Sequence, residues 1–169
     1  MTLKRLFSVL ALAGVVFSLL AFVPNNLVRP TPVAFAQGGP GCTPVGGVLM
    51  TNIGAISGEY NLGPVFGDLA GSVAANIVGS TSTTYTLQHY WVTASGDSIY
   101  FAPAVLTPTY PVASDTAIVA VPWGNYISNI TGGTGKFKNA TGALSYFGMA
   151  DFGQNTLVLR YRGQVCYAH

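Results

Sequence analysis

The side chains able to exchange a proton near neutral pH are few in this chain. Of the two histidines, His169 is the last residue, and His89 stands in an apolar stretch between Leu87 and Trp91. An imidazole in this position could act as a general base or orient a ligand by hydrogen bonding. A hydrogen-bonded histidine of the core or rim is the interpretation we favour, because the neighbours on its face of the strand are apolar.

Two carboxylates, Glu59 and Asp68, are the acidic candidates for chemistry. If either pointed into a protein interior, loss of water would raise its pKa and make it a proton donor or a polar anchor. A solvated position on a strand is the more ordinary alternative for both side chains. Glu59, Asp68 and His89 are therefore the candidate catalytic residues, with no role assigned to any of them.

Metal ions and phosphate groups have no recognisable binding pattern in this sequence. Two distant histidines and two cysteines give no metal-ligand spacing, so we predict neither a metal nor a cofactor. The glycines before Lys136 do not form a phosphate loop, because Phe137 stands where a serine or threonine is needed. A Ser-His-Asp arrangement that uses His89 stays open, although no Gly-x-Ser-x-Gly elbow is present.

The N-terminal segment is typical of a secretory signal peptide. Lys4 and Arg5 precede an apolar run over residues 6–23, and Ala34-Phe35-Ala36 offers a small-x-small cleavage site. We predict cleavage after Ala36 and a secreted or extracytoplasmic protein without a membrane span. Because the run is also long enough to cross a bilayer, an uncleaved anchor remains the alternative.

Cleavage would change the charge balance of the protein. It would leave four basic side chains against five acidic ones, a net charge of −1. No basic surface of the size needed to neutralise a run of phosphates would remain, so we exclude nucleic acid as a partner.

Two cysteines lie near the two ends of the predicted mature chain. Cys42 falls in what we expect to be a flexible lead-in over residues 37–44, and Cys166 falls near the end of the predicted domain, residues 45–169. In an oxidising compartment we expect them to form a disulfide. Two free thiols or an intermolecular bridge are the alternatives.

Short runs rich in Val, Ile, Thr, Tyr and Phe, separated by Gly, Asn, Asp and Pro, predict β-strands throughout the domain. The expected strands are residues 45–52, 57–62, 66–79, 83–93, 98–106, 115–122, 141–151 and 156–167. Gly63-Pro64 is expected to separate the second strand from the third. Because a disulfide would join the first strand to the last, we predict an all-β fold, a single closed antiparallel β-barrel of about eight strands.

The segment from Gly132 to Gly142 carries a resemblance to a known family. Its glycines at 132, 133, 135 and 142, with Phe137 between them, resemble the glycine-rich turn of the allene oxide cyclase and dirigent barrel superfamily, which joins two late strands. The resemblance implies a calycin-like closed barrel over most of residues 45–167. Members of the superfamily hold a reactive intermediate in one conformation, but their catalytic residues lie outside this motif, so none is transferred here.

Three functions follow as hypotheses. Alternation in the strand over residues 83–93 places Tyr85, Leu87, His89 and Trp91 on one face, so we expect them to line an interior that binds a small hydrophobic or aromatic molecule. A cofactor-free cyclase or isomerase, as the resemblance implies, is the second hypothesis. A structural barrel filled by its own side chains is the third, with a homo-oligomer as a possible partner arrangement. Independently of these hypotheses, Arg160 and Arg162 share the face opposite the aromatic residues of their strand, so we expect them on an outer surface or an oligomer contact.

Overall fold

A computed structural model describes residues 41–112 and 114–168, and all structural statements refer to these. The predicted signal peptide, the first half of the expected lead-in (residues 37–40) and His169 lie outside the described residues. The strands are β1 (Cys42–Ile56), β2 (Tyr60–Gly67), β3 (Gly71–Ser80), β4 (Tyr85–Thr93), β5 (Ser98–Phe101), β6 (Ala104–Leu106), β7 (Ile118–Val121), β8 (Ile127–Gly133), β9 (Thr141–Asp151) and β10 (Thr156–Cys166), with a 3₁₀ helix, η1 (Gly135–Phe137).

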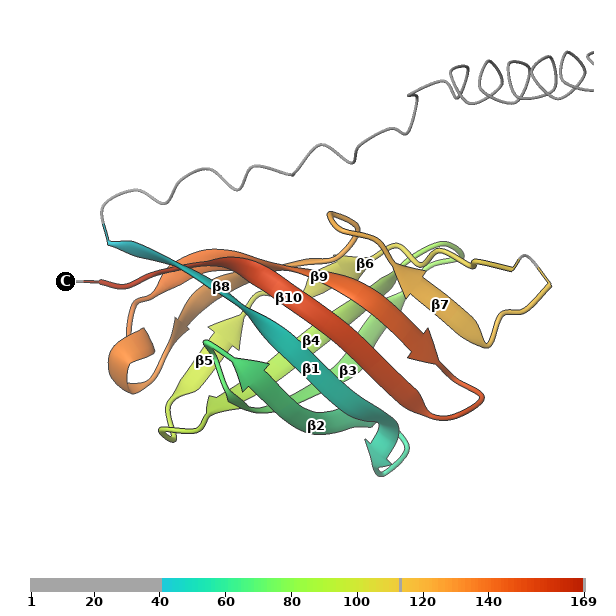
Figure 1. The fold of residues 1–169 in the computed structure, drawn as a ribbon, viewed down its shortest axis with the longest axis horizontal. Coiled ribbons are helices and arrows are strands. Elements are labelled where there is room, and N and C mark those ends of the chain that lie inside the picture. The colour runs from blue at the N-terminus through green and yellow to red at the C-terminus, as the bar shows by residue number, and fades with distance from the viewer. Residues whose placement is uncertain (1–40, 113, 169) are drawn as a thin grey trace, which may run out of the picture. The chain divides into compact units, whose positions relative to one another are not determined.

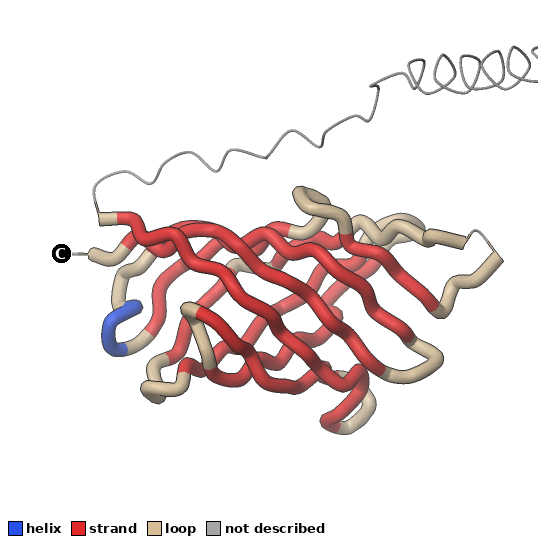
Figure 2. The backbone as a smooth tube through the Cα atoms, viewed as in Figure 1, coloured by secondary structure: helices blue, strands red, loops and turns tan. Residues whose placement is uncertain are grey.

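The strands form one antiparallel sheet that closes on itself (Figures 1 and 2). Pairing runs β10-β1-β2-β3-β4-β5-β8-β9, and β9 pairs with β10 to complete the ring. The short strand β6 pairs with β4 beyond β5, and β7 pairs with β9 beyond β8. The prediction of a closed antiparallel barrel of eight strands is thereby confirmed.

Two of the eight positions in the ring are each built from two short strands, which the sequence did not predict. Residues 98–106 were expected to form one strand, but Ala102-Pro103 interrupts it between β5 and β6. Proline has no backbone N–H to give to a ladder, so an interruption at Pro103 is physically reasonable. The expected strand 115–122 is reduced to β7, and β8 was missed entirely.

The boundary predicted at Gly63-Pro64 is wrong. Both residues lie inside β2, where they pair with Val73 and Ser72 of β3, and the turn comes later, at residues 68–70. On the other side of β2, Val65 pairs with Leu49 of β1 and Leu62 pairs with Asn52, and neither Gly63 nor Pro64 has a recorded partner in β1. The absence of a recorded β1 partner at Pro64 agrees with a residue that has no backbone N–H to donate.

One end of the barrel is filled with large side chains. Trp91, Tyr161, Phe137, Leu69 and Val165 are all almost completely buried there. Trp91 Nε1 donates a hydrogen bond to the Leu69 carbonyl oxygen at 3.0 Å, and the Leu69 N–H donates to the Tyr161 hydroxyl at 3.0 Å. Because both polar groups are satisfied, these aromatic side chains close the barrel without leaving a buried group unpaired.

The glycine-rich segment is a backbone junction at this filled end. A Cβ on Gly133 would come within 2.2 Å of the Ser98 carbonyl oxygen and 2.6 Å of Phe137 Cβ, so only glycine allows β8 to lie this close to β5. Gly135 adopts a φ of +51°, which begins η1. Phe137 is fully buried and ends the 3₁₀ helix.

The predicted disulfide between Cys42 and Cys166 is present. The two residues face each other where β1 pairs with β10, so the expected lead-in gives its last three residues to β1. The bond therefore joins the first and last strands of the ring, and it is compatible with an extracellular location.

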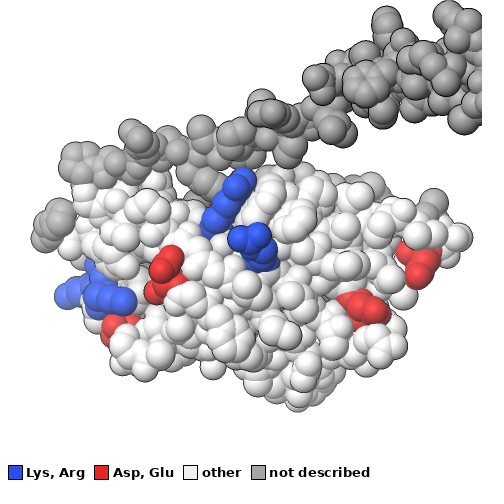
Figure 3. Space-filling view, viewed as in Figure 1, with Lys and Arg blue, Asp and Glu red and all other residues white. Residues whose placement is uncertain are grey.

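The outer surface of the barrel carries little charge (Figure 3). Arg160 is exposed and the Arg162 guanidinium lies 4.1 Å from the centroid of the Trp123 ring, whereas Leu159 and Tyr161, which alternate with them, are buried. The outward direction predicted for both arginines is confirmed. Between residues 41 and 168, as far as they are described, no helix is long and apolar enough to cross a membrane.

Candidate functional site

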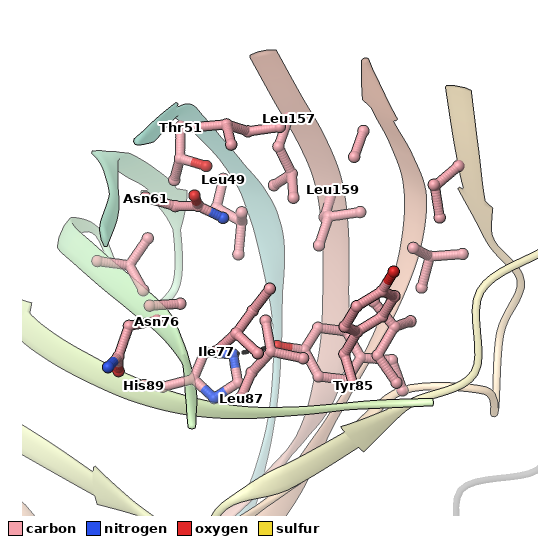
Figure 4. A pocket seen from close by; sticks show the side chains of 18 of the residues that line it. Leu49, Thr51, Asn61, Asn76, Ile77, Tyr85, Leu87, His89, Leu157 and Leu159 are labelled. Atoms are coloured by element: carbon pink, nitrogen blue, oxygen red, sulfur yellow. Dashed lines mark hydrogen bonds between the residues drawn. The ribbon is translucent and has the colours of Figure 1, made fainter. Parts of the chain in front are cut away.

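A cavity of about 340 Å³ occupies the half of the barrel opposite the filled end (Figure 4). Its rim includes Gly58 and Glu59 from the turn between β1 and β2, and Phe152 from the turn between β9 and β10. The opening therefore lies at the end of the barrel that these two turns form. A volume of this size is typical of a small-molecule site.

The walls of the cavity are mainly aliphatic. Leu49 of β1, Leu87 of β4 and Leu159 of β10 are buried side chains that face it, with further valines from β3 and β7. In Figure 4, Leu87 and His89 lie across the cavity from Leu157 and Leu159. Strand alternation explains this lining, because every second side chain of each strand faces the interior.

A cluster of polar side chains forms the floor of the cavity. The Tyr126 hydroxyl is hydrogen-bonded to His89 Nε2, and the Ser128 hydroxyl lies 3.3 Å from His89 Nδ1. The Tyr146 ring stacks on the imidazole with 5.8 Å between centroids, and it lies 4.8 Å from the Tyr126 ring. Both nitrogens of His89 therefore have hydroxyl partners, and two tyrosines fix the plane of its ring.

Burial keeps this cluster uncharged. Loss of water lowers the pKa of His89 to about 4, so its imidazole is neutral at physiological pH. Burial also raises the pKa of the Tyr126 and Tyr146 hydroxyls. The floor can thus donate, accept or pass on a proton through hydrogen bonds, but it carries no charge that could neutralise an ionic group.

Thr51, Asn61 and Asn76 add polar atoms to the wall nearer the opening. The Asn76 side-chain oxygen is buried without a hydrogen-bond partner. The Thr51 hydroxyl is buried without a hydrogen-bond partner. The Asn61 side-chain oxygen accepts a hydrogen bond of 3.4 Å from the Gly54 N–H. Figure 4 shows Thr51 and Asn61 together on the wall that β1 and β2 form.

The three candidate catalytic residues do not lie together. His89 is buried at the cavity floor, and Glu59 is exposed at the rim. Asp68 lies in the turn between β2 and β3 at the filled end, where its carboxylate accepts a hydrogen bond of 2.8 Å from the Gly46 N–H. The structure therefore brings at most His89 and Glu59 to the same cavity.

The four residues expected to line the interior are divided by depth. Tyr85, Leu87 and His89 line the cavity. Trp91 faces the same way but belongs to the filled end, where it packs against Tyr161 with 5.4 Å between centroids. Trp91 is therefore part of the core and does not line this cavity.

Sequence analysis missed Tyr126, Ser128 and Tyr146. Tyr126 and Ser128 belong to a segment that we did not predict as a strand, so no alternation was available to orient them. Tyr146 lies in the predicted strand 141–151, two residues after the buried Leu144. That spacing would have placed Tyr146 on the inner face.

No group of three or more His, Cys, Asp or Glu side chains that could hold a metal ion occurs among the residues described. The cavity contributes only His89 and the exposed Glu59 from these residue types. The other polar groups that line the cavity are hydroxyl, amide and neutral imidazole groups.

Comparison with known proteins gives one structural similarity. No protein-family model matches the chain, and no curated protein matches it. The chain is similar to the structure of a pterocarpan synthase dirigent protein, with 14% sequence identity and a TM-score of 0.31 over 75% of this chain and 85% of that chain. A TM-score of this size does not establish a shared fold, so the resemblance to the allene oxide cyclase and dirigent barrels stays a prediction.

Proposed function

We propose that this protein is a secreted binding barrel that holds a small hydrophobic or aromatic molecule in its interior. The observation that supports this function is the cavity of about 340 Å³, with aliphatic walls and a few polar groups at defined positions. Small-molecule sites have this composition, because apolar walls supply affinity and polar groups supply orientation. A barrel filled by its own side chains is less compatible with such a space.

Adjacent residues of β3 offer a matched pair of variants for the test. Ala75 faces the cavity, whereas Ala74 pairs with the exposed Tyr90 on the outer face. An Ala75→Phe side chain would occupy the cavity, and an Ala74→Phe side chain of the same size would stay outside.

The experiment is a fluorescence titration of the purified protein with 1-aminoanthracene, an uncharged apolar probe. We expect saturable binding at micromolar concentrations, at least about tenfold weaker binding by Ala75→Phe, and unchanged binding by Ala74→Phe. Saturation only at millimolar concentrations, or equal binding by the two variants, would show that the interior is not a binding site.

A cofactor-free isomerase or cyclase is the second candidate, and the hydrogen-bonded pair of His89 and Tyr126 favours it. A neutral imidazole next to a hydroxyl can relay a proton to or from a substrate bound above it. Any isomerase activity found for this protein should then fall strongly in His89→Phe and persist in Asp68→Asn. Activity that survives the His89 substitution would leave binding as the better assignment.

A further inference from the structure

We propose that the bound molecule is uncharged, that it carries an acceptor oxygen such as a carbonyl at its outer end, and that the side-chain amide of Asn61 donates a hydrogen bond to this oxygen. The inference rests on the proposed binding function and specifies its ligand. It assigns Asn61 a role in selecting and orienting that ligand.

The orientation of the Asn61 amide is fixed by a break in the pairing of β1 with β2. The register shifts between Asn52 and Ile56, and Gly54 inside this stretch adopts a φ of +70°. The Gly54 N–H donates a hydrogen bond of 3.4 Å to Asn61 Oδ1. Because only the oxygen of a side-chain amide can accept a hydrogen bond from an N–H, the NH₂ group of Asn61 must point away from Gly54.

The NH₂ group of Asn61 is a donor that the protein leaves available to a ligand. Among the residues that the structure describes, it donates no hydrogen bond. Asn61 is half-buried and lines the cavity, and its nitrogen is not among the fully buried side-chain atoms that lack a partner. Figure 4 shows this nitrogen directed into the cavity. A ligand oxygen could therefore reach it and gain a hydrogen bond without displacing a protein group.

Other polar atoms of the lining do not offer a ligand the same contact. The Thr51 hydroxyl and the Asn76 side-chain oxygen are fully buried. At the cavity floor, both nitrogens of His89 already have hydroxyl partners. Asn61 is therefore the side chain of this wall that can donate to a ligand.

The charge near the Asn61 amide favours an uncharged oxygen over a carboxylate. Glu59 precedes Asn61 by two residues, lines the rim of the same cavity, and is exposed and acidic. Among the described lining residues there is no lysine or arginine. An anion would lose water on entering the cavity without gaining a positive partner, and Glu59 would repel it.

The position of Asn61 also sets the direction in which the ligand lies. Asn61 is the second residue of β2, just after the turn that forms part of the opening, whereas the walls below it are aliphatic. The oxygen of the ligand should thus lie near the opening and its apolar body should point toward the floor. A cavity of about 340 Å³ is at the lower end of the range for small-molecule sites, which suits a substituted bicyclic aromatic compound.

Three compounds of nearly the same shape separate apolar affinity, oxygen recognition and charge. They are 2-acetylnaphthalene, 2-isopropenylnaphthalene, in which CH₂ replaces the ketone oxygen, and 2-naphthoate, in which O⁻ replaces the methyl group. The experiment measures their dissociation constants at pH 7 by displacement of 1-aminoanthracene. We expect the ketone to bind at least as tightly as the hydrocarbon, although its oxygen must lose water, and at least about tenfold more tightly than 2-naphthoate.

The test of Asn61 is the ratio of the hydrocarbon and ketone dissociation constants in matched variants. Asn61→Asp keeps an oxygen to accept from the Gly54 N–H but removes the donor, so this ratio should shift about three- to tenfold against the ketone. Thr51→Val removes a neighbouring hydroxyl that a ligand does not reach, so the ratio should stay within about twofold of the wild-type value.

The outcomes separate the inference from the function on which it rests. If none of the three compounds binds, the proposed binding function itself is wrong. If the hydrocarbon binds but the wild type prefers it to the ketone, or prefers 2-naphthoate to both, the binding function stands and the inference about the ligand is overturned. A ratio that is unchanged in Asn61→Asp, or that shifts only in Thr51→Val, would overturn the role of Asn61.

Discussion

His89 is a buried side chain that its neighbours hold in one orientation while it lines the cavity. Its ring is held by hydroxyl groups on both nitrogens and by stacking on Tyr146. The surrounding apolar walls make the charged form unfavourable, so the imidazole stays neutral while it lines the cavity. A protonated His89 would be a charge with no carboxylate partner beside it.

This neutrality predicts how stability depends on pH. The pKa of His89 is about 4 in the folded protein and about 6.5 in the unfolded chain, so below pH 6.5 the unfolded state binds a proton that the folded state does not. The free energy of unfolding should therefore fall as the pH drops from about 6.5 to about 4, by up to about 3 kcal/mol. Urea unfolding of the wild type and His89→Gln across this range measures the effect. The same slope in both proteins would contradict the assignment.

At the scale of elements, the residues that end and connect the strands shape the barrel as much as the strands do. Ala102-Pro103 separates β5 from β6, and η1 turns the chain between β8 and β9. The glycine-rich segment works through close backbone approach, since Gly133 lies against the Ser98 carbonyl of β5. Such a contact limits how far apart β8 and β5 can lie at the filled end.

Two strand glycines allow this close approach to be tested. Gly133→Ala places a methyl group within 2.2 Å of a backbone oxygen, whereas the nearest atom to a Cβ at Gly79 is 3.7 Å away. We expect Gly133→Ala to lower the free energy of unfolding by at least about 2 kcal/mol, because backbone must move. Gly79→Ala should be neutral or stabilising by about 0.5 kcal/mol. Equal thermal denaturation midpoints for the two variants would show that β8 and β5 are not so closely packed.

At the scale of the whole molecule, closure of the ring depends on the seam between the first and last strands. β1 and β10 pair continuously from Cys42↔Cys166 to Asn52↔Thr156, and the disulfide stands at one end of this ladder. The bond thus adds to a seam that hydrogen bonds already close. Both the filled end and the cavity depend on that closure, because their side chains come from strands on both sides of it.

Removal of the disulfide should weaken the barrel without opening it. With a sequence separation of 124, the chain-entropy model gives a loss of about 4 to 5 kcal/mol for Cys42→Ala/Cys166→Ala. The strand ladder should survive, so the far-ultraviolet circular dichroism spectrum should not change while the urea midpoint falls. Reductant should lower the midpoint of the wild type and leave the variant unaffected. An unchanged midpoint in the variant would show that the bond does not constrain the unfolded chain.

The sequence alone determined the class of fold, the closing disulfide and the inner face of several strands. Alternation with a period of two is a local property, so the inward direction of Leu87, His89 and Trp91 could be predicted from β4 itself. The division of two ring positions into the short strands β5 and β6, and β7 and β8, could not be predicted in this way. It depends on which neighbouring strand each segment pairs with.

Only the tertiary structure decided which inward side chains enclose a cavity. His89 and Trp91 are two residues apart on the same face, yet one lines a hollow and the other fills the core. The difference comes from Tyr161, Phe137 and Leu69, which other parts of the chain supply at the depth of Trp91. The packing at a given depth of the barrel depends on side chains from strands that are distant in the sequence, so a local sequence pattern cannot predict it.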